Sequence, residues 1–379
     1  MTKTLALYVH WPFCVSKCPY CDFNSHVRAQ VDEQAWERAL LHELQRVREL
    51  TGSRQLTSIF FGGGTPSLMQ PQTVAAVIDK AVSLYTTHPD LEITLEANPQ
   101  STEIARFQQF AEAGVNRVSI GVQSFDEDAL RFLGRGHDSS EAIRAITTAQ
   151  GLFGRVSFDL IYARPEQTLD QWQAELTQAL GFGTEHLSVY QLTIEQGTAF
   201  ATQHARQDFL MPDEEQAGDF YELTQSILAE AGLPAYEISN HARKGAASQH
   251  NVSYWRYQDY AGVGPGAHGR LTLADARVAT RQVRAPELWL ESVATKGHGD
   301  ADCETLSLET QGVEALMMGL RLTEGIDTSE LPRPLEQIVN LQALELLKSK
   351  GFLQQEAGHL SATSAGLQRL NAVLAKLLS

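Results

Sequence analysis

The sequence predicts an α/β fold, an open partial (β/α)6 barrel followed by a small C-terminal winged-helix-like domain. Strand-like apolar runs alternate with helical patterns over about the first 195 residues, six such strands occur there, and the end of the chain is mostly helical. Six βα units imply a parallel sheet with right-handed crossovers. Six strands are too few to close an eight-stranded barrel, which favours an open one. A doubly wound sheet is the competing architecture.

Each element of the barrel is predicted from the spacing of its apolar residues. The predicted strands are 5–9, 58–62, 91–97, 117–122, 156–162 and 186–192. Between the first and second strands, apolar residues recur at helical spacing at Trp36, Leu40, Leu44 and Val47. Between the second and third strands, they recur at Val74, Val77, Ile78 and Ala81.

Beyond the sixth strand the pattern changes. A helix is predicted over 213–231 and a short strand over 235–238, before a segment rich in glycine and aromatic residues. The pattern over 307–379 is helix, helix, hairpin and helix, which is typical of a winged-helix-like domain. The predicted domains are therefore a core at 1–232, a linking segment at 233–304 and a C-terminal helical domain at 305–379.

Composition excludes several classes of function. The chain has 379 residues and a formal net charge of −16. Nucleic acid is not expected as a partner, because binding phosphates requires clustered lysine and arginine. No apolar run approaches the roughly 20 residues needed to span a bilayer. The N-terminus lacks the pattern of a signal peptide, so a cytoplasmic location is expected.

The cysteines are arranged for metal binding. Cys14, Cys18 and Cys21 lie together in "CVSKCPYCDF", and the fourth, Cys303, is far away. Three clustered cysteines and one distant one do not form a disulfide framework. In a cytosolic chain, such a cluster indicates a metal site.

Polar and glycine residues follow every predicted strand. In parallel βα folds, the ligand lies at the C-terminal edge of the sheet. The residues that follow the strands are the three cysteines, the loop Gly62–Ser67, Glu96 with Asn98, Gln123, Asp159, and Tyr190 with Gln191. The pattern predicts one large site. The glycine loop is expected to approach a ligand closely and to offer it backbone amides.

Two metal sites are compatible with three thiolates. A structural zinc site needs four protein ligands, and His10 or His26 would complete it. Three cysteines alone would instead leave one iron of a four-iron cluster open to a small molecule with amino and carboxylate groups. The glycine loop and the strand-end residues favour the open cluster.

The chain resembles the radical S-adenosylmethionine (SAM) proteins in its motif CxxxCxxC and in the aromatic Tyr20 before the last cysteine of that motif. More closely, it resembles the oxygen-independent coproporphyrinogen III oxidase family. The matching segments are "YVHWPFC", "FFGGGTPS", "EANP", "GVQSF", "LGRGH", "FDLIYARP", "YQLTIEQGT", "YEISN", "HNVSYW" and "GPGAH". They extend over nearly the whole chain.

The resemblance implies a radical SAM barrel with a [4Fe–4S] cluster on Cys14, Cys18 and Cys21 and SAM on its fourth iron. Tyr20 would pack near the cluster. The positions that match SAM contacts are Tyr8, Gly63, Gly64, Thr65, Glu96, Gln123, Arg135 and Asp159. Glu96 and Asp159 are suited to accept from ribose hydroxyls or an amino group, and Arg135 could pair with a carboxylate. A helix cap or surface ion pair is the alternative role for each carboxylate.

Two branches of the family matter. The oxidase branch, which decarboxylates two propionates of coproporphyrinogen III, resembles CxxxCxxCxC with a longer N-terminal segment. The haem-chaperone branch, which hands haem to acceptor proteins, resembles CxxxCxxCxF with a short N-terminus and an HNxxYW motif. This chain has Phe23 two residues after the last cysteine of the motif, an N-terminal segment of only 13 residues before Cys14, and "HNVSYW" at 250–255. All three features favour the chaperone. The oxidase, a porphyrin-modifying enzyme, is the alternative.

The chaperone branch implies haem as cargo. His250 offers an imidazole for haem iron, and Tyr254 or Trp255 could stack on the porphyrin. A buried histidine with two core aromatics is the alternative. The branch also implies haem-accepting partners, respiratory or membrane-associated, and a homodimer as one oligomeric state.

One position departs from the family pattern. Where the family reads Pro-Gly-Gln after the fifth strand, this chain has "RPEQT", with Glu166. If that position needs a positive φ, the loop geometry changes, while the cluster and SAM positions are untouched.

Overall fold

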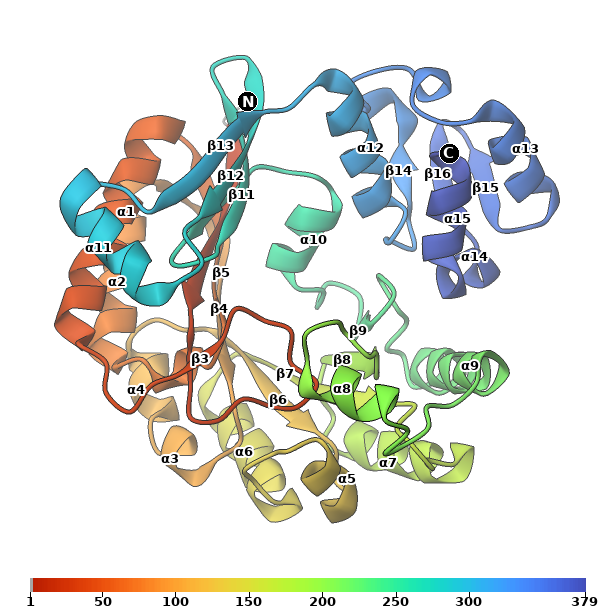
Figure 1. Cartoon of the computed structure of the whole chain (residues 1–379), viewed down its shortest axis with the longest axis horizontal. Coiled ribbons are helices and arrows are strands. Elements are labelled where there is room, and N and C mark those ends of the chain that lie inside the picture. Colours follow the sequence, from red (N-terminus) through yellow and green to blue (C-terminus); the bar gives the residue numbers. More distant parts are fainter. Residues whose placement is uncertain (1–2) are drawn as a thin grey trace.

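The computed structural model describes residues 3–379 and contains the predicted partial barrel (Figure 1). Its six parallel strands are β1 (Thr4–Trp11), β4 (Gln55–Gly63), β5 (Thr86–Ala97), β6 (Arg117–Gln123), β7 (Arg155–Tyr162) and β8 (His186–Gln191). They neighbour one another in chain order, without the reversal that defines a doubly wound sheet. The barrel prediction is therefore confirmed.

The helices between these strands bury the predicted apolar faces. The longer ones are α1 (Glu33–Thr51), α2 (Pro71–Leu84), α6 (Ser139–Leu152), α7 (Leu169–Gly181) and α9 (Glu214–Glu230). Shorter ones are α3 (Ser101–Ile104), α4 (Phe107–Glu112), α5 (Glu127–Phe132) and α8 (Ala199–Ala205). In α1 and α2 every residue of the two predicted apolar sets is buried in the main core. The side chain of Asp32 accepts from the amide of Ala35 and so caps α1.

The chain then returns to widen the sheet on both sides. Strand β9 (Asn240–Ala242) pairs antiparallel with β8. On the other edge, β10 (Tyr260–Val263) runs parallel to β1, followed by β11 (His268–Leu273), β12 (Ala276–Gln282) and β13 (Asp300–Thr305). The strand predicted at 235–238 is misplaced, since only Ala235 makes a bridge there. The residues of the linking segment thus extend the barrel sheet.

Two helices accompany this return. Helix α11 (Pro286–Lys296) follows β12, and the stacked rings of Trp36 and Trp289 join it to α1. Helix α10 (Gln249–Trp255) carries the HNxxYW motif and lies between the sheet and the C-terminal helices in Figure 1. A hydrogen bond of 2.7 Å joins Ser58 Oγ on β4 to His250 Nδ1. The motif therefore packs against the barrel strands.

The C-terminal residues form the predicted winged-helix-like arrangement, with an apolar cluster of their own. Its elements are α12 (Leu308–Gly319), β14 (Ile326–Asp327), α13 (Leu341–Ser349), β15 (Leu353–Glu356), β16 (His359–Ala362), α14 (Ser364–Gln368) and α15 (Leu370–Leu377). The three strands form a sheet in the order β14-β16-β15. The exact domain boundaries stay a prediction.

Candidate functional site

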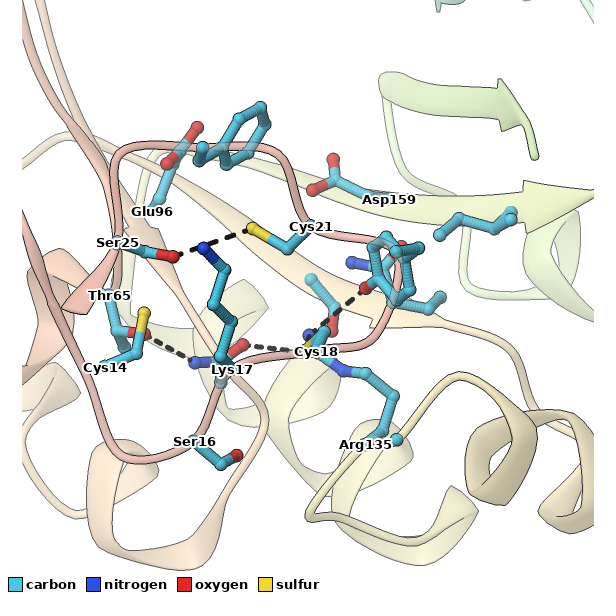
Figure 2. A pocket seen from close by; sticks show the side chains of 18 of the residues that line it. Cys14, Ser16, Lys17, Cys18, Cys21, Ser25, Thr65, Glu96, Arg135 and Asp159 are labelled. Carbon is cyan, nitrogen blue, oxygen red and sulfur yellow. Dashed lines mark hydrogen bonds between the residues drawn. The ribbon is translucent and has the colours of Figure 1, made fainter. Parts of the chain in front are cut away.

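One cavity of about 360 Å³ lies at the C-terminal ends of the parallel strands, where the sequence predicts the site (Figure 2). The cluster loop, residues 12–25, forms one wall and the strand ends form the floor. The predicted cluster and SAM residues that line it are Cys14, Cys18, Tyr20, Cys21, Gly63, Gly64, Thr65, Glu96, Gln123, Arg135 and Asp159, and the strand-end residues Asn98, Tyr190 and Gln191 line it too. The structure therefore brings together all the cysteines and all but one of the expected SAM positions.

Each cysteine of the loop has a polar neighbour (Figure 2). The hydroxyl of Thr65 donates to Cys14 Sγ at 3.3 Å, and Arg135 Nη1 donates to Cys18 Sγ at 3.3 Å. Ser25 Oγ lies 3.8 Å from Cys21 Sγ. Burial raises the pKa of the Cys14 and Cys21 thiols, and the hydroxyls of Thr65 and Ser25 oppose that rise. The donors are thus placed to stabilise thiolates once a metal replaces the protons.

The histidines considered for a zinc site are differently placed. The two ring nitrogens of His10 lie 3.0 Å from Tyr8 Oη and 3.0 Å from the carbonyl of Asn24. Neither His10 nor His26 lines the cavity. Within residues 3–379, no three His, Cys, Asp or Glu side chains are grouped to hold a single metal ion. A multi-iron cluster does not require that grouping, since each thiolate binds its own iron.

The glycine loop, which was expected to approach a ligand, packs closely against the cluster loop. A Cβ on Gly64 would lie 2.7 Å from the carbonyl oxygen of Phe13, so glycine lets the cluster loop pack against β4. The amide of Gly64 donates to the carbonyl of Trp11 at 2.7 Å, and that of Thr65 to the carbonyl of Phe13 at 2.8 Å. The amides expected to face a ligand are therefore engaged within the chain, and the glycines hold the cysteine loop in place.

Two carboxylates occupy the floor of the cavity. Glu96, on β5, accepts from the amide of Gly63 at 3.3 Å, and burial raises its pKa to about 8. Asp159, on β7, accepts from the hydroxyl of Ser119 at 3.3 Å, and burial raises its pKa to about 6. The negative charge of Asp159 further raises the pKa of Glu96. Burial of the two carboxylates thus disfavours negative charge on the floor, and a ligand with donor groups or a positive charge would stabilise their charged forms.

This arrangement predicts a pH-dependent effect of Glu96→Gln on the cofactor-free protein. Because folding raises the pKa of Glu96 from 4.5 to about 8, the folded state holds a proton that the unfolded state has released. Wild-type stability therefore falls as the pH rises through that interval, and a glutamine abolishes this loss. The melting temperature of E96Q should exceed that of wild type by more at pH 9 than at pH 5.

Glu195→Gln is the matched control, since it removes a carboxylate from the exposed part of the same cavity. E195Q should follow wild type at both pH values. A constant difference between E96Q and wild type would contradict the prediction.

Arg135 joins the cluster loop to the floor. Its Nη2 donates to the carbonyl of Gly121 at 2.8 Å and to Asn98 Oδ1, and its Nη1 lies 3.4 Å from Tyr20 Oη. Gln123, at the end of β6, has a φ of 71°, a conformation that costs a non-glycine residue about 1–3 kcal/mol. Such strain is typical of functional positions. The contact of Asn98 with Arg135 and the inward position of Ser119 were not predicted.

Tyr8 does not line the cavity. Its hydroxyl lies 3.0 Å from His10 Nδ1, and its ring stacks on those of Phe60 and His250. Its predicted contact with SAM stays a prediction.

The HNxxYW residues also lie away from the cavity. His250 is 1% exposed, its two nitrogens meet Ser58 Oγ and Tyr254 Oη, and burial lowers its pKa to about 3. Trp255 packs beneath the guanidinium of Arg321, 4.6 Å from the ring centroid. In this conformation His250 occupies a core position. The haem contacts predicted for His250, Tyr254 and Trp255 stay a prediction.

The departure at Glu166 has a structural consequence. Glu166 is exposed and has a φ of 60°, the left-handed conformation that favours glycine. Glu166 therefore forms this turn in a strained conformation, and it does not line the cavity.

Comparisons with known proteins also indicate a radical SAM protein. The radical SAM superfamily matches residues 8–178, and the HemN C-terminal domain matches residues 306–369. The "Radical S-adenosyl methionine domain-containing protein 1, mitochondrial" of Bos taurus is 41% identical, with 100% of this chain and 88% of that protein covered. The "Heme chaperone HemW" of Escherichia coli (strain K12) is 37% identical, with 99% and 98% covered.

Among solved structures, coproporphyrinogen III oxidase (HemN) from Escherichia coli, a radical SAM enzyme, matches with a TM-score of 0.82 at 20% identity. The match covers 100% of this chain and 91% of that one. This likeness shows a shared fold. No helix in residues 3–379 is long and apolar enough to cross a membrane. The extent and identity of the sequence matches place the chain in the HemW-like family of radical SAM proteins, whose superfamily implies a [4Fe–4S] cluster and SAM.

Proposed function

We propose that this protein is a haem chaperone, which binds haem and transfers it to acceptor haem proteins while carrying a [4Fe–4S] cluster and SAM. The full-length match to the heme chaperone HemW of Escherichia coli carries the proposal. Phe23, two residues after the last cysteine of the motif, supports this branch of the family over the oxidase. The proposal places the transfer in the cytoplasm, with respiratory or membrane-associated acceptors and a homodimer as one state of the carrier.

The residues of the cavity fit the two resident groups. In the proposal Cys14, Cys18 and Cys21 hold the cluster, which, when bound, supplies an iron with an open position for the amino and carboxylate groups of SAM. Arg135 Nε is buried and has no partner in the described chain, so it is free to pair with a carboxylate. The pKa values of Glu96 and Asp159 are raised by burial, and donor groups of a bound ligand would lower them. The two carboxylates would then be charged acceptors when the ligand is bound.

The other cavity residues position these groups. Thr65 and Arg135 donate to two of the cysteine sulfurs and so fix their directions. Gln123, Gly63 and Gly64 also line the cavity and complete the proposed SAM site. Tyr20 lies in contact with Arg135 and Phe200, and these contacts hold its ring against the cavity.

The alternative is an oxygen-independent coproporphyrinogen III oxidase, an enzyme whose fold this chain shares. Both are tested on the anaerobically reconstituted protein, shown by iron and sulfide analysis to carry its cluster and by binding assay to bind SAM. Given SAM, a reductant and coproporphyrinogen III, it should form no protoporphyrinogen by chromatography. Loaded with haemin, it should pass haem to the haem-free form of a respiratory haem protein faster than its haem dissociates to buffer. Steady formation of protoporphyrinogen would favour the oxidase instead.

A further inference from the structure

The mouth of the cavity differs from its floor. The floor is polar and carries Glu96, Arg135 and Asp159, whereas three large apolar or aromatic side chains line the cavity and still face solvent. These are Val15 and Phe23, each 60% exposed, and Tyr190, 41% exposed. We refer to Val15, Phe23 and Tyr190 as the rim. Exposed apolar side chains that line a pocket favour a ligand with apolar surface, because such a ligand removes them from water.

Phe23 is held in place although its ring is exposed. The amide of Ser25 donates to the carbonyl of Phe23 at 2.7 Å, and Ser25 itself is buried. Between them, the side-chain amide of Asn24 donates to the carbonyls of Pro265 at 2.9 Å and Arg284 at 3.0 Å. The loop is thereby tied to the widened edge of the sheet. An aromatic ring on a fixed backbone loses little conformational entropy when a ligand covers it, which makes it an effective anchor.

We propose that the rim is the seat of the haem macrocycle, with Phe23 stacked on one of its faces; this inference rests on the proposed function. A flat ring system with two apolar faces matches a mouth lined by two aromatic side chains and a valine. The polar floor behind the rim is left to the cluster and SAM. Phe23 then has a role as a contact for the cargo, in addition to distinguishing the branch.

Charge at the mouth would orient the macrocycle. The exposed residues that line the mouth include one cation, Lys17, and two carboxylates, Asp22 and Glu195. Figure 2 shows the Lys17 side chain extending inside the loop that carries the three cysteines. The anionic propionates of haem are expected on the side of Lys17, away from the carboxylates. By contrast, the imidazole of His250 is covered and engaged in this conformation.

The test is the affinity of the cluster-loaded protein for two probes, haemin and metal-free protoporphyrin IX, followed by absorbance and by porphyrin fluorescence. Phe23→Ala should weaken both by about tenfold, since stacking and burial of the ring are lost in each case. Val15→Ala should weaken both by about threefold. Phe23→Trp should restore binding. Val27→Ala is the matched control, because Val27 is 49% exposed, two residues beyond the cluster loop, and does not line the cavity.

Three outcomes overturn the inference. Unchanged affinity of F23A in a protein that still binds and delivers haem would place the cargo elsewhere and leave the proposed function standing. Loss of haemin binding in His250→Ala with unaltered iron, sulfide and SAM binding, while F23A binds normally, would assign the cargo to the HNxxYW motif. Normal haemin affinity but slower delivery by F23A would make the rim a surface for the acceptor protein. Failure of wild type to bind haemin would instead overturn the proposed function itself.

Discussion

Replacing Cys18 by alanine is expected to reduce the iron and sulfide of the anaerobically reconstituted protein to background. Cys18 lies at the centre of the predicted motif, and its sulfur receives a hydrogen bond from Arg135 at 3.3 Å. Thiolates are the ligands of iron–sulfur clusters, and two remaining thiolates would leave two irons of the cluster without a protein ligand. SAM binding should be lost together with the cluster. Iron and sulfide analysis, with the visible absorbance of the cluster, measures the effect.

Cys303→Ala is the matched control. Cys303 is exposed on β13 and lies outside the cavity. C303A should therefore retain the iron, sulfide and SAM binding of wild type. A C18A protein with full iron content and wild-type absorbance would show that another residue supplies the third ligand, and the role proposed for this cysteine would have to be abandoned.

The barrel was predictable because its signals are local. Each parallel strand is a short apolar run that ends in polar residues or glycine, and the helices between them show their apolar faces in the spacing of Trp36, Leu40 and Leu44. Parallel topology then places all strand ends on one edge. Cys14, Glu96 and Asp159 therefore meet in one cavity, as the sequence predicted.

The widened sheet was not predictable in the same way. Strands β10 to β13 are added after the barrel, and the partner of β10 is β1, some 250 residues earlier in the chain. A pairing of this kind leaves no local pattern in the sequence. The glycine-rich segment before β11 was visible, yet its reason is tertiary, since a Cβ on Gly262 would lie 2.2 Å from the carbonyl oxygen of His268.

The HNxxYW motif shows the same limit for the site. A histidine with two nearby aromatic residues fits a haem site and a packed core equally well in sequence terms. The structure places His250 against Ser58 and Phe60 of β4. Those contacts depend on the short helix α10 returning to a strand that it follows by nearly 200 residues. Spacing within the motif carries no information about that return.

The anchoring of α10 leads to the second large effect, which we expect from Glu92→Ala. The buried carboxylate of Glu92 forms an ion pair with Arg155 at 2.6 Å and accepts from the amides of Gln249 and His250 at 3.1 Å each. Removing it leaves a largely buried guanidinium without its charge partner and the first amides of α10 without acceptors. Breaking such a pair costs about 3–5 kcal/mol. The free energy of unfolding in guanidinium chloride should fall by about that amount.

The ion pair of Arg28 with Glu287 is the control that separates the effect of burial from that of distance. Its nitrogen and oxygen are also 2.6 Å apart, but the side chain of Glu287 is 62% exposed, whereas that of Glu92 is 1% exposed. Glu287→Ala should therefore lower the free energy of unfolding far less than Glu92→Ala does, since water and salt screen exposed pairs. Equal losses in E92A and E287A would mean that separation alone sets the strength of these pairs. A larger loss in E92A than in E287A would show that burial strengthens the ion pair, and that the buried carboxylate of Glu92 holds α10 and its motif to the barrel.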